Sequence, residues 1–234
     1  MDTTIKGIHH ITAMTSDAKK NFDFYTKVLG MRLIKKTVNQ DDVSAYHLFY
    51  ADDKGNPGTD LTFFEFRNSP KRVDGTNRIG RFSLRVKNDK ALDYWLQRFD
   101  EFNVPHSEII DFFGAKSITF EDIDGLEMRL LSDEKNEGMA AGVPYPQSVV
   151  PADYQIIGLG VIQLQVHQPE LTIRFLTEVL GFYELDRDDK GILFEIGEKG
   201  HGAQVYLVED KTPTMERQGF GGVHHIALRV DDRN

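Results

Sequence analysis

Apolar residues recur at helical spacing in two distant segments that end in nearly the same sequence. One segment ends with TKVLGM at residues 26–31 and the other with TEVLGF at residues 177–182. Each ends at a glycine suited to the left-handed position that follows a helix. The chain therefore carries two copies of one amphipathic helix. The apolar faces are Phe22, Tyr25, Val28 and Leu29 in the first copy, and Phe175, Leu176, Val179 and Leu180 in the second.

Alternating apolar and polar residues predict strands that open repeated units. SLRV at 83–86 matches ALRV at 227–230, and VIQLQV at 161–166 has the same half-buried pattern. A third amphipathic helix follows the first of these strands, with Asp89 as its expected N-cap, and Pro169 suits the first turn of the second helix copy. Later strands are predicted at 44–51, 60–66, 117–122, 126–131, 191–197 and 203–209.

These elements predict an α+β fold made of tandem βαβββ modules. The expected modules are residues 1–77, 78–142 and 155–220, with a linker at 143–154 that contains three prolines. Residues 221–234 supply only the first strand of a fourth module, which we expect to be truncated.

Composition narrows the class of protein. No apolar run approaches the roughly 18 residues of a membrane span, so no membrane partner is expected. The N-terminus lacks a secretory pattern, which favours a cytoplasmic protein. A net charge of -9 without a basic block argues against nucleic acid. The absence of cysteine leaves only nitrogen and oxygen side chains as metal ligands. Whether the protein is a homo-oligomer stays open.

Histidines recur at one position of the opening strands. His10 and His225 occupy the same place in the first and fourth modules, whereas Arg81 and Val161 occupy it in the second and third. Imidazole is a common ligand of transition metals, and the two rings could meet if modules one and four face each other. This alignment pairs Ile11, Phe82, Ile162 and Ile226.

Each of these histidines has a histidine neighbour. Because strand side chains alternate between faces, His9 and His10 are not expected to point into the same concavity, and the same holds for His224 and His225. One member of each pair is therefore the candidate ligand.

A third ligand is harder to find. A carboxylate usually completes an open site with two imidazoles. Glu65 and Glu127 lie on predicted strands, but an exposed strand carboxylate is the simpler interpretation of both. The expected place is the last strand of module four, beyond residue 234.

The βαβββ modules together with GIHHIT, YHLFYAD, GNPGT and GGVHHIA resemble the vicinal oxygen chelate superfamily, and within it the hydroquinone-type ring-cleaving dioxygenases. The resemblance covers the whole chain. It implies that His10 and His225 bind the metal and that His9 and His224 lie in its second shell, near the substrate. It also implies a glutamate ligand late in module four, which no residue here matches, so this chain is expected to bind metal poorly and to be incomplete for activity.

The implied reaction is extradiol-type cleavage of a hydroquinone or catechol-like ring. The substrates would be a small aromatic compound and dioxygen. The expected cofactor is Fe(II), with Mn(II) or another divalent metal as the alternative. The resemblance allows His224 or His9 to act as general acid or base.

Two other functions stay open. A glyoxalase-like isomerase or lyase would favour glutamates where Thr62 and Arg129 stand, and a non-catalytic small-molecule binding protein would be expected to have only two modules. Arg81 and Val161 suggest that modules two and three are a structural half. His47 could face the pocket from a neighbouring strand, but a structural role is the favoured interpretation. The remaining histidines, His106, His167 and His201, are expected to be solvated.

Overall fold

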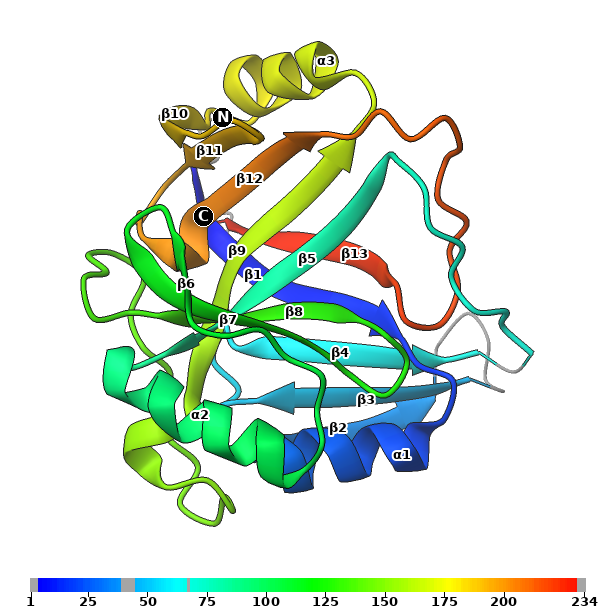
Figure 1. The fold of residues 1–234 in the computed structure, drawn as a ribbon, viewed down its shortest axis with the longest axis vertical. Helices are drawn as coiled ribbons and strands as arrows, with labels where there is room; N and C mark the ends of the chain where they lie inside the picture. Colours follow the sequence, from blue (N-terminus) through cyan, green and yellow to red (C-terminus); the bar gives the residue numbers. More distant parts are fainter. Residues whose placement is uncertain (1–3, 39–44, 67, 231–234) are drawn as a thin grey trace.

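The computed structural model describes residues 4–38, 45–66 and 68–230. A strand, a helix and three strands follow one another three times, and a last strand follows them (Figure 1). The predicted α+β class of tandem βαβββ units is therefore confirmed. The module bounds stay predictions, and residues 1–3, 231–234 and Ser44 of one expected strand lie outside the described residues.

The elements have the following bounds. The first unit contains β1 (Ile5–Met14), α1 (Ala18–Asp23) with a π-turn (Phe24–Val28), β2 (Arg32–Val38), β3 (Tyr46–Ala51) and β4 (Asp60–Glu65). The second contains β5 (Arg78–Val86), α2 (Asp89–Glu101), β6 (Ile110–Phe112), β7 (Ala115–Glu121) and β8 (Glu127–Ser132). The third contains β9 (Ile156–Val166), α3 (Pro169–Arg174) with a π-turn (Phe175–Val179), β10 (Tyr183–Arg187), β11 (Gly191–Glu195) and β12 (Gln204–Glu209). The last strand is β13 (Val223–Val230).

The strands form two curved sheets. One has the order β13-β1-β4-β3-β2 and the other β10-β11-β12-β9-β5-β8-β7-β6. Figure 1 shows β1 beside β13, and β5 beside β9. The first unit therefore shares a sheet with the last strand, and the second unit shares a sheet with the third.

The strand register confirms the alignment made from the sequence. Ile11 and Ile226 are direct partners in the antiparallel β1 and β13 pair. Phe82 and Ile162 are direct partners in the equivalent β5 and β9 pair. The two sheets thus repeat one arrangement with different side chains.

The glycines predicted to follow the two similar helices are found there, but the cap of α2 differs from the predicted residue. Gly30 and Gly181 follow α1 and α3 at φ 67° and 82°, the left-handed conformation that favours glycine. The cap of α2 is Asn88, not Asp89: the Asn88 side chain accepts a hydrogen bond from the Ala91 amide at 3.1 Å. Helical backbone angles begin at Asp89, so the extended residue before it is the cap.

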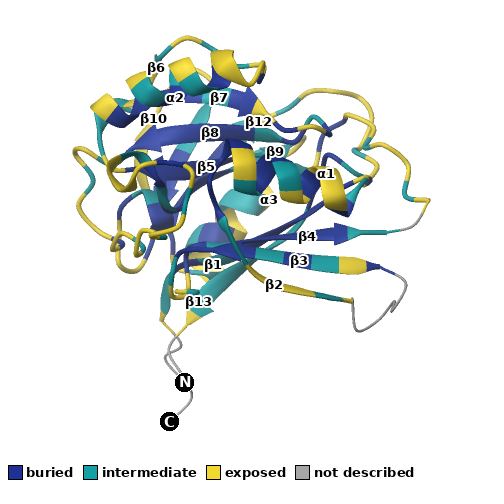
Figure 2. Cartoon of the chain, turned by 90° about the horizontal axis from the view of Figure 1, so that it is seen from below, coloured by how far each residue is buried: buried dark blue, intermediate teal, exposed yellow. Residues whose placement is uncertain are grey.

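The main core lies between the sheets and the helices α1 and α2. It includes Tyr25 and Phe63 from the first unit and Phe82 and Trp95 from the second, all fully buried. A smaller core lies under α3. Figure 2 shows the contrast between the buried strand β5 and the exposed edge strand β2.

The apolar face predicted for α3 is only partly buried. Leu176 is buried, but Phe175 and Val179 are 51% and 69% exposed, and Phe22 of the first copy is 38% exposed. Three of the residues named for the apolar faces are therefore exposed in the structure. No element of the described chain covers that side of α3.

The linker region packs against the first unit. The Val143 amide donates to Asp52 Oδ2 at 2.7 Å, and the Ser148 hydroxyl donates to the Gly30 carbonyl at 2.6 Å.

Among the described residues, no helix combines the length and the apolar character needed to cross a membrane.

Candidate metal centre

His10 and His225 converge from adjacent strands. Their Nε2 atoms are 3.2 Å apart, and both side chains are half-buried. The Thr12 hydroxyl lies 3.1 Å from His225 Nε2 and 2.8 Å from the Thr62 hydroxyl. The residues that the sequence places 215 positions apart therefore share one small polar centre.

The first histidine of each pair is the extra residue of a β-bulge. Ile8 on β1 is opposite Leu228 on β13, and the next pair is His10 opposite Ala227. His9 is therefore an additional residue on β1. A second bulge places His224 as the additional residue on β13. Bulges re-aim side chains and occur often beside active sites.

Both bulges bring neighbouring imidazoles into contact. The Nδ1 atoms of His9 and His10 are 3.0 Å apart, and those of His224 and His225 are 2.8 Å apart. Simple alternation predicts opposite directions for each pair, but the bulges break that alternation. If His10 and His225 donate their Nδ1 protons, their Nε2 lone pairs face the shared centre.

The electrostatic surroundings keep the central imidazoles neutral. Burial lowers the pKa of His10 to about 4, with further contributions from His9 and His225. Burial and the neighbouring His224 also lower the pKa of His225. Neutral imidazole is the form that binds metal ions, so both rings are ready to act as ligands near neutral pH.

His47 lies beside this centre, which agrees with the less favoured of the two interpretations made from the sequence. Its Nε2 atom lies 3.1 Å from the Thr62 hydroxyl. Its ring centre lies 3.9 Å from that of Phe49 and 4.1 Å from that of Phe64. Burial, followed by His10 and His225, lowers its pKa to about 4. The available signal was alternation along β3, which puts His47 and Phe49 on one face.

Neither glutamate considered from the sequence reaches the centre. Glu65 accepts a hydrogen bond from the Ala18 amide at 2.9 Å, at the start of α1. Glu127 pairs with Arg78 and Arg81 at 3.2 and 3.3 Å in the other sheet. Within the ranges that the structure describes, no three histidine or acidic side chains are grouped closely enough to hold a metal ion.

Asp60 is the carboxylate beside His10 in the ladder, since the two are direct partners on β4 and β1. Burial, with Asp52 nearby, raises the pKa of Asp60 to about 6. Its Oδ1 atom is buried and has no hydrogen-bond partner among the described residues. The sequence analysis did not single out this residue.

The remaining histidines lie elsewhere. The prediction of a solvated side chain agrees with the exposed His167, but His106 and His201 are only partly exposed. His106 contacts the Ser107 carbonyl at 2.9 Å, and His201 Nδ1 lies 2.8 Å from Asp133. These neighbouring acceptors explain the departure from the prediction.

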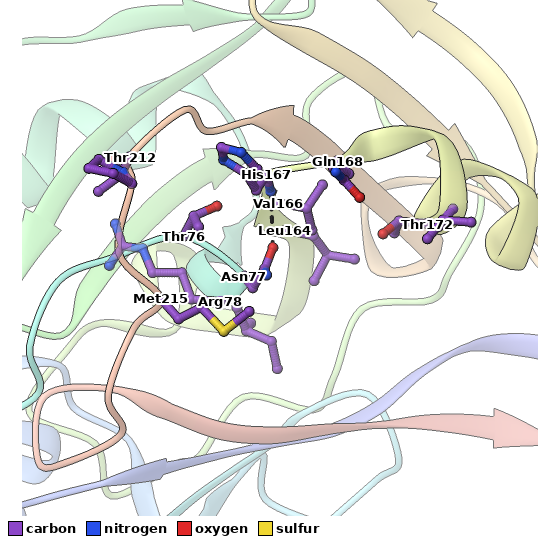
Figure 3. A pocket seen from close by; sticks show the side chains of 13 residues that line it. Thr76, Asn77, Arg78, Leu164, Val166, His167, Gln168, Thr172, Thr212 and Met215 are labelled. Carbon is purple, nitrogen blue, oxygen red and sulfur yellow. Dashed lines mark hydrogen bonds between the residues drawn. The ribbon is translucent and has the colours of Figure 1, made fainter.

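One pocket is separate from the histidine centre. It measures about 670 Å³ and lies between β5, β9 and the start of α3 (Figure 3). Its lining includes Arg78, Leu164 and Met215. Figure 3 shows the hydrogen bond from the His167 amide to Asn77 Oδ1, 3.0 Å long, at its wall. Neither His10 nor His225 lines it.

Comparison with known proteins identifies the class. Residues 7–130 and 158–234 match the family model described as "Glyoxalase/Bleomycin resistance protein/Dioxygenase superfamily". The chain belongs to this superfamily, as its fold and paired histidine strands had indicated.

Several individual proteins are similar over nearly the whole chain. A relative from Bacillus subtilis (strain 168), named "Putative ring-cleaving dioxygenase MhqA", is 44% identical over 233 residues, covering 97% of this chain and 73% of the relative. The chlorohydroquinone/hydroquinone 1,2-dioxygenase of Sphingobium indicum is 29% identical over 97% of this chain and 71% of that enzyme.

Solved structures show the same fold. The structure described as a "putative dioxygenase" from Bacillus subtilis has a TM-score of 0.86 and 33% identity, covering 98% of this chain and 71% of that one. Glyoxalase I from Zea mays has a TM-score of 0.67 at 16% identity, covering 97% of this chain and 75% of that one, and shows likeness of fold alone.

Proposed function

We propose that this protein is a metal-dependent, ring-cleaving dioxygenase that acts on a hydroquinone or catechol-like aromatic compound. The single observation that carries the proposal is the approach of His10 Nε2 and His225 Nε2 to 3.2 Å from opposite ends of the chain. The names of the relatives support the reaction class.

The side chains present fit a divalent metal ion. His10 and His225 offer neutral nitrogen ligands, and the hydroxyl groups of Thr12 and Thr62 lie beside them. We propose Fe(II), with Mn(II) or another divalent ion as the alternative, because nitrogen and oxygen ligands with open positions suit either. A carboxylate would complete this ligand set. When bound, such an ion would supply adjacent positions for the aromatic hydroxyl and for dioxygen.

The protein's own residues would orient and protect the reacting ring. Phe49 and Phe64 flank His47, and the Phe64 ring also lies 5.5 Å from the ring of His224. This aromatic wall can pack against a planar substrate and exclude water. His47 Nε2 and the Thr62 hydroxyl offer hydrogen bonds at the edge of the wall.

The roles of His9 and His224 stay predictions. Acid or base catalysis by either residue is one possibility that follows from the resemblance. Their Nδ1 contacts with the candidate ligands favour a positioning role, in which they fix the tautomer of His10 and His225. A fall in metal affinity on substitution, with the pH dependence of turnover unchanged, would distinguish positioning from proton transfer.

The experiment that tests the function measures metal content and oxygen uptake with a hydroquinone after reconstitution with Fe(II). The chain of 234 residues is compared with a form extended through the fourth module. We expect bound iron and oxygen consumption in the extended form, and loss of both in its His10→Ala and His225→Ala variants. The matched control is His167→Ala, which replaces an exposed histidine that follows β9. Isomerisation of a hemithioacetal without oxygen uptake would support the glyoxalase-like alternative, and ligand binding without metal would support a binding protein.

A further inference from the structure

The second sheet carries a buried arginine where the first sheet carries the histidine centre. Arg129 is 6% exposed. It is the direct partner of Ser83 in the parallel β5 and β8 ladder, as Thr62 is the partner of Thr12 in the parallel β1 and β4 ladder. The two positions are therefore equivalent in the repeat.

Arg129 faces the inside of the curved sheet. Its guanidinium carbon lies 3.6 Å from the centre of the Phe112 ring. The Phe112 ring in turn packs 5.5 Å from that of Tyr206, although their strands, β6 and β12, are far apart in the sheet order. The sheet therefore curls so that these side chains meet across its concave face.

The Arg129 guanidinium has no anionic partner. Among the residues that the structure describes, it makes no hydrogen bond or ion pair, and its Nε atom is fully buried. A buried charge without a partner is costly, and arginine does not relieve the cost by losing its proton. An unpartnered guanidinium in this position is what an anion-binding site requires.

Two neighbouring residues of Arg129 also have buried polar atoms without hydrogen-bond partners in the described chain. The Nε atom of Arg81 and the hydroxyl of Ser83 are also buried without partners in the described chain. The carboxylate near Arg81 is Glu127, which it shares with Arg72 and Arg78 at distances from 3.2 to 3.5 Å. Arg129, Arg81 and Ser83 therefore each have a buried polar atom without a partner among the described residues.

A pocket adjoins this cluster. It measures about 330 Å³, and its lining includes Arg81 and Thr119, the strand partner of Arg129. Glu121 and His106 also line it. Of the three cluster residues, this pocket exposes Arg81, and Arg129 and Ser83 lie behind its lining.

We infer that the concave face of the second sheet is a binding site for a small carboxylate, held by Arg129, Arg81 and Ser83. The planar guanidinium donates in a fork that matches a carboxylate, and Phe112 covers one guanidinium face and leaves its edges for that contact. The apolar side chains of Val161 and Leu193 on the same face suit an organic acid better than inorganic phosphate. The half whose aligned positions hold Arg81 and Val161 instead of histidines would then bind ligand as well.

The test measures the melting temperature and, by calorimetry, the affinity of the metal-free 234-residue protein for benzoate, acetate and inorganic phosphate. We expect a saturable rise in melting temperature with benzoate and a weaker response to phosphate. Arg129→Leu keeps an apolar contact with Phe112 and should weaken benzoate binding at least tenfold. Arg174→Leu, which removes an exposed arginine of α3, should leave it unchanged.

Two further variants test the proposed site independently of Arg129→Leu. Ser83→Ala should weaken benzoate binding severalfold even if Arg129→Leu does not fold, and His225→Ala should bind benzoate normally because the histidine centre is separate. An absent benzoate response, an equal response in Arg129→Leu, or a response lost only in His225→Ala would overturn the site. Saturable binding of phosphate without benzoate or acetate would overturn the assignment to a carboxylate.

Discussion

The concave faces of the two sheets share one backbone plan and differ in their chemistry. In the first sheet the bulged positions are histidines and the centre is imidazole and hydroxyl. In the second sheet, the β5 and β9 pair has bulges at the equivalent places. Gly80 and Gly160 stand where the first sheet has His9 and His224, and Arg81 stands in place of His10. The bulges therefore belong to the fold, and the side chains placed on them decide what each half can bind.

The outer faces of the sheets differ much less. Residues from both sheets and from α1 and α2 form one buried cluster. The Arg98 guanidinium joins the helices by donating to the Val28 carbonyl at 2.7 Å. The comparison thus predicts that stability is shared between the halves, whereas binding is local to each concave face.

The largest effect is expected from the shared core. Phe63→Ala removes a fully buried ring that lies 4.6 Å from the Tyr25 ring, and should cost about 3–5 kcal/mol of unfolding free energy. Urea unfolding can be followed by Trp95, the sole tryptophan, which lies in α2 of the other half. Phe22→Ala, which removes a largely solvent-exposed phenylalanine of the same unit, is the matched control. An unchanged Trp95 transition in Phe63→Ala would mean that the halves unfold independently.

The second effect concerns the arginine cluster. Glu127→Gln removes the carboxylate that Arg72, Arg78 and Arg81 share, and we expect a loss of about 1–3 kcal/mol because the partly buried arginines keep their charge. Thermal unfolding at low and high salt measures it. The control is Glu209→Gln, which breaks an exposed pair with Lys211. Equal stability of the two variants would show that solvent screens the cluster.

The repeated fold could be predicted from the sequence because each module carries the same local signals. The TKVLGM and TEVLGF segments mark equivalent helix ends, and both fold into the same π-turn, with Leu29 and Leu180 bonded to the carbonyls five residues earlier. The individual strands β2, β6 and β10, each the first strand after a helix, were missed. β10 is exposed at all five residues, so it has no apolar alternation to detect.

The candidate site was predictable only in part. The register of the repeats brought His10 and His225 to one place, because equivalent strands pair side by side. The contact between His9 and His10 depends on a bulge, and a bulge cannot be recognised from the alternation of apolar and polar residues along one strand. His47 and Asp60 reach the region through the pairing of β3, β4 and β1, which a single segment does not encode.

A smaller effect is expected at the bulge. His9→Gly gives the first sheet the residue type that the second sheet has at the equivalent position. The backbone should tolerate it, but His10 loses its Nδ1 partner, so Mn(II) affinity should fall about 10-fold or more. Calorimetric titration measures the affinity, and circular dichroism verifies the fold. His167→Gly, which replaces an exposed histidine outside the centre, should not change it. Unaltered affinity in His9→Gly would remove the positioning role.

The smallest effect is the pH dependence of stability at His47. Its pKa is about 4 in the folded protein and near 6.5 when unfolded, so the unfolded chain binds the extra proton between these values. Folding stability from this residue is therefore present above pH 6.5 and is lost as the pH falls towards 4. Because the side chain is only half-buried, we expect about 1 kcal/mol between pH 7 and pH 5.

The difference between the native protein and His47→Gln isolates this contribution. Asp60 and Asp122 have pKa values raised to about 6 by burial and act in the opposite direction, but they are common to both proteins and cancel. Urea unfolding of both metal-free proteins at pH 7 and pH 5 should show the native protein losing more stability on acidification. A parallel decline would mean that His47 is protonated as easily when folded as when unfolded. The neutral imidazole centre, which sets the first sheet apart from the cationic second sheet, would then not extend to β3.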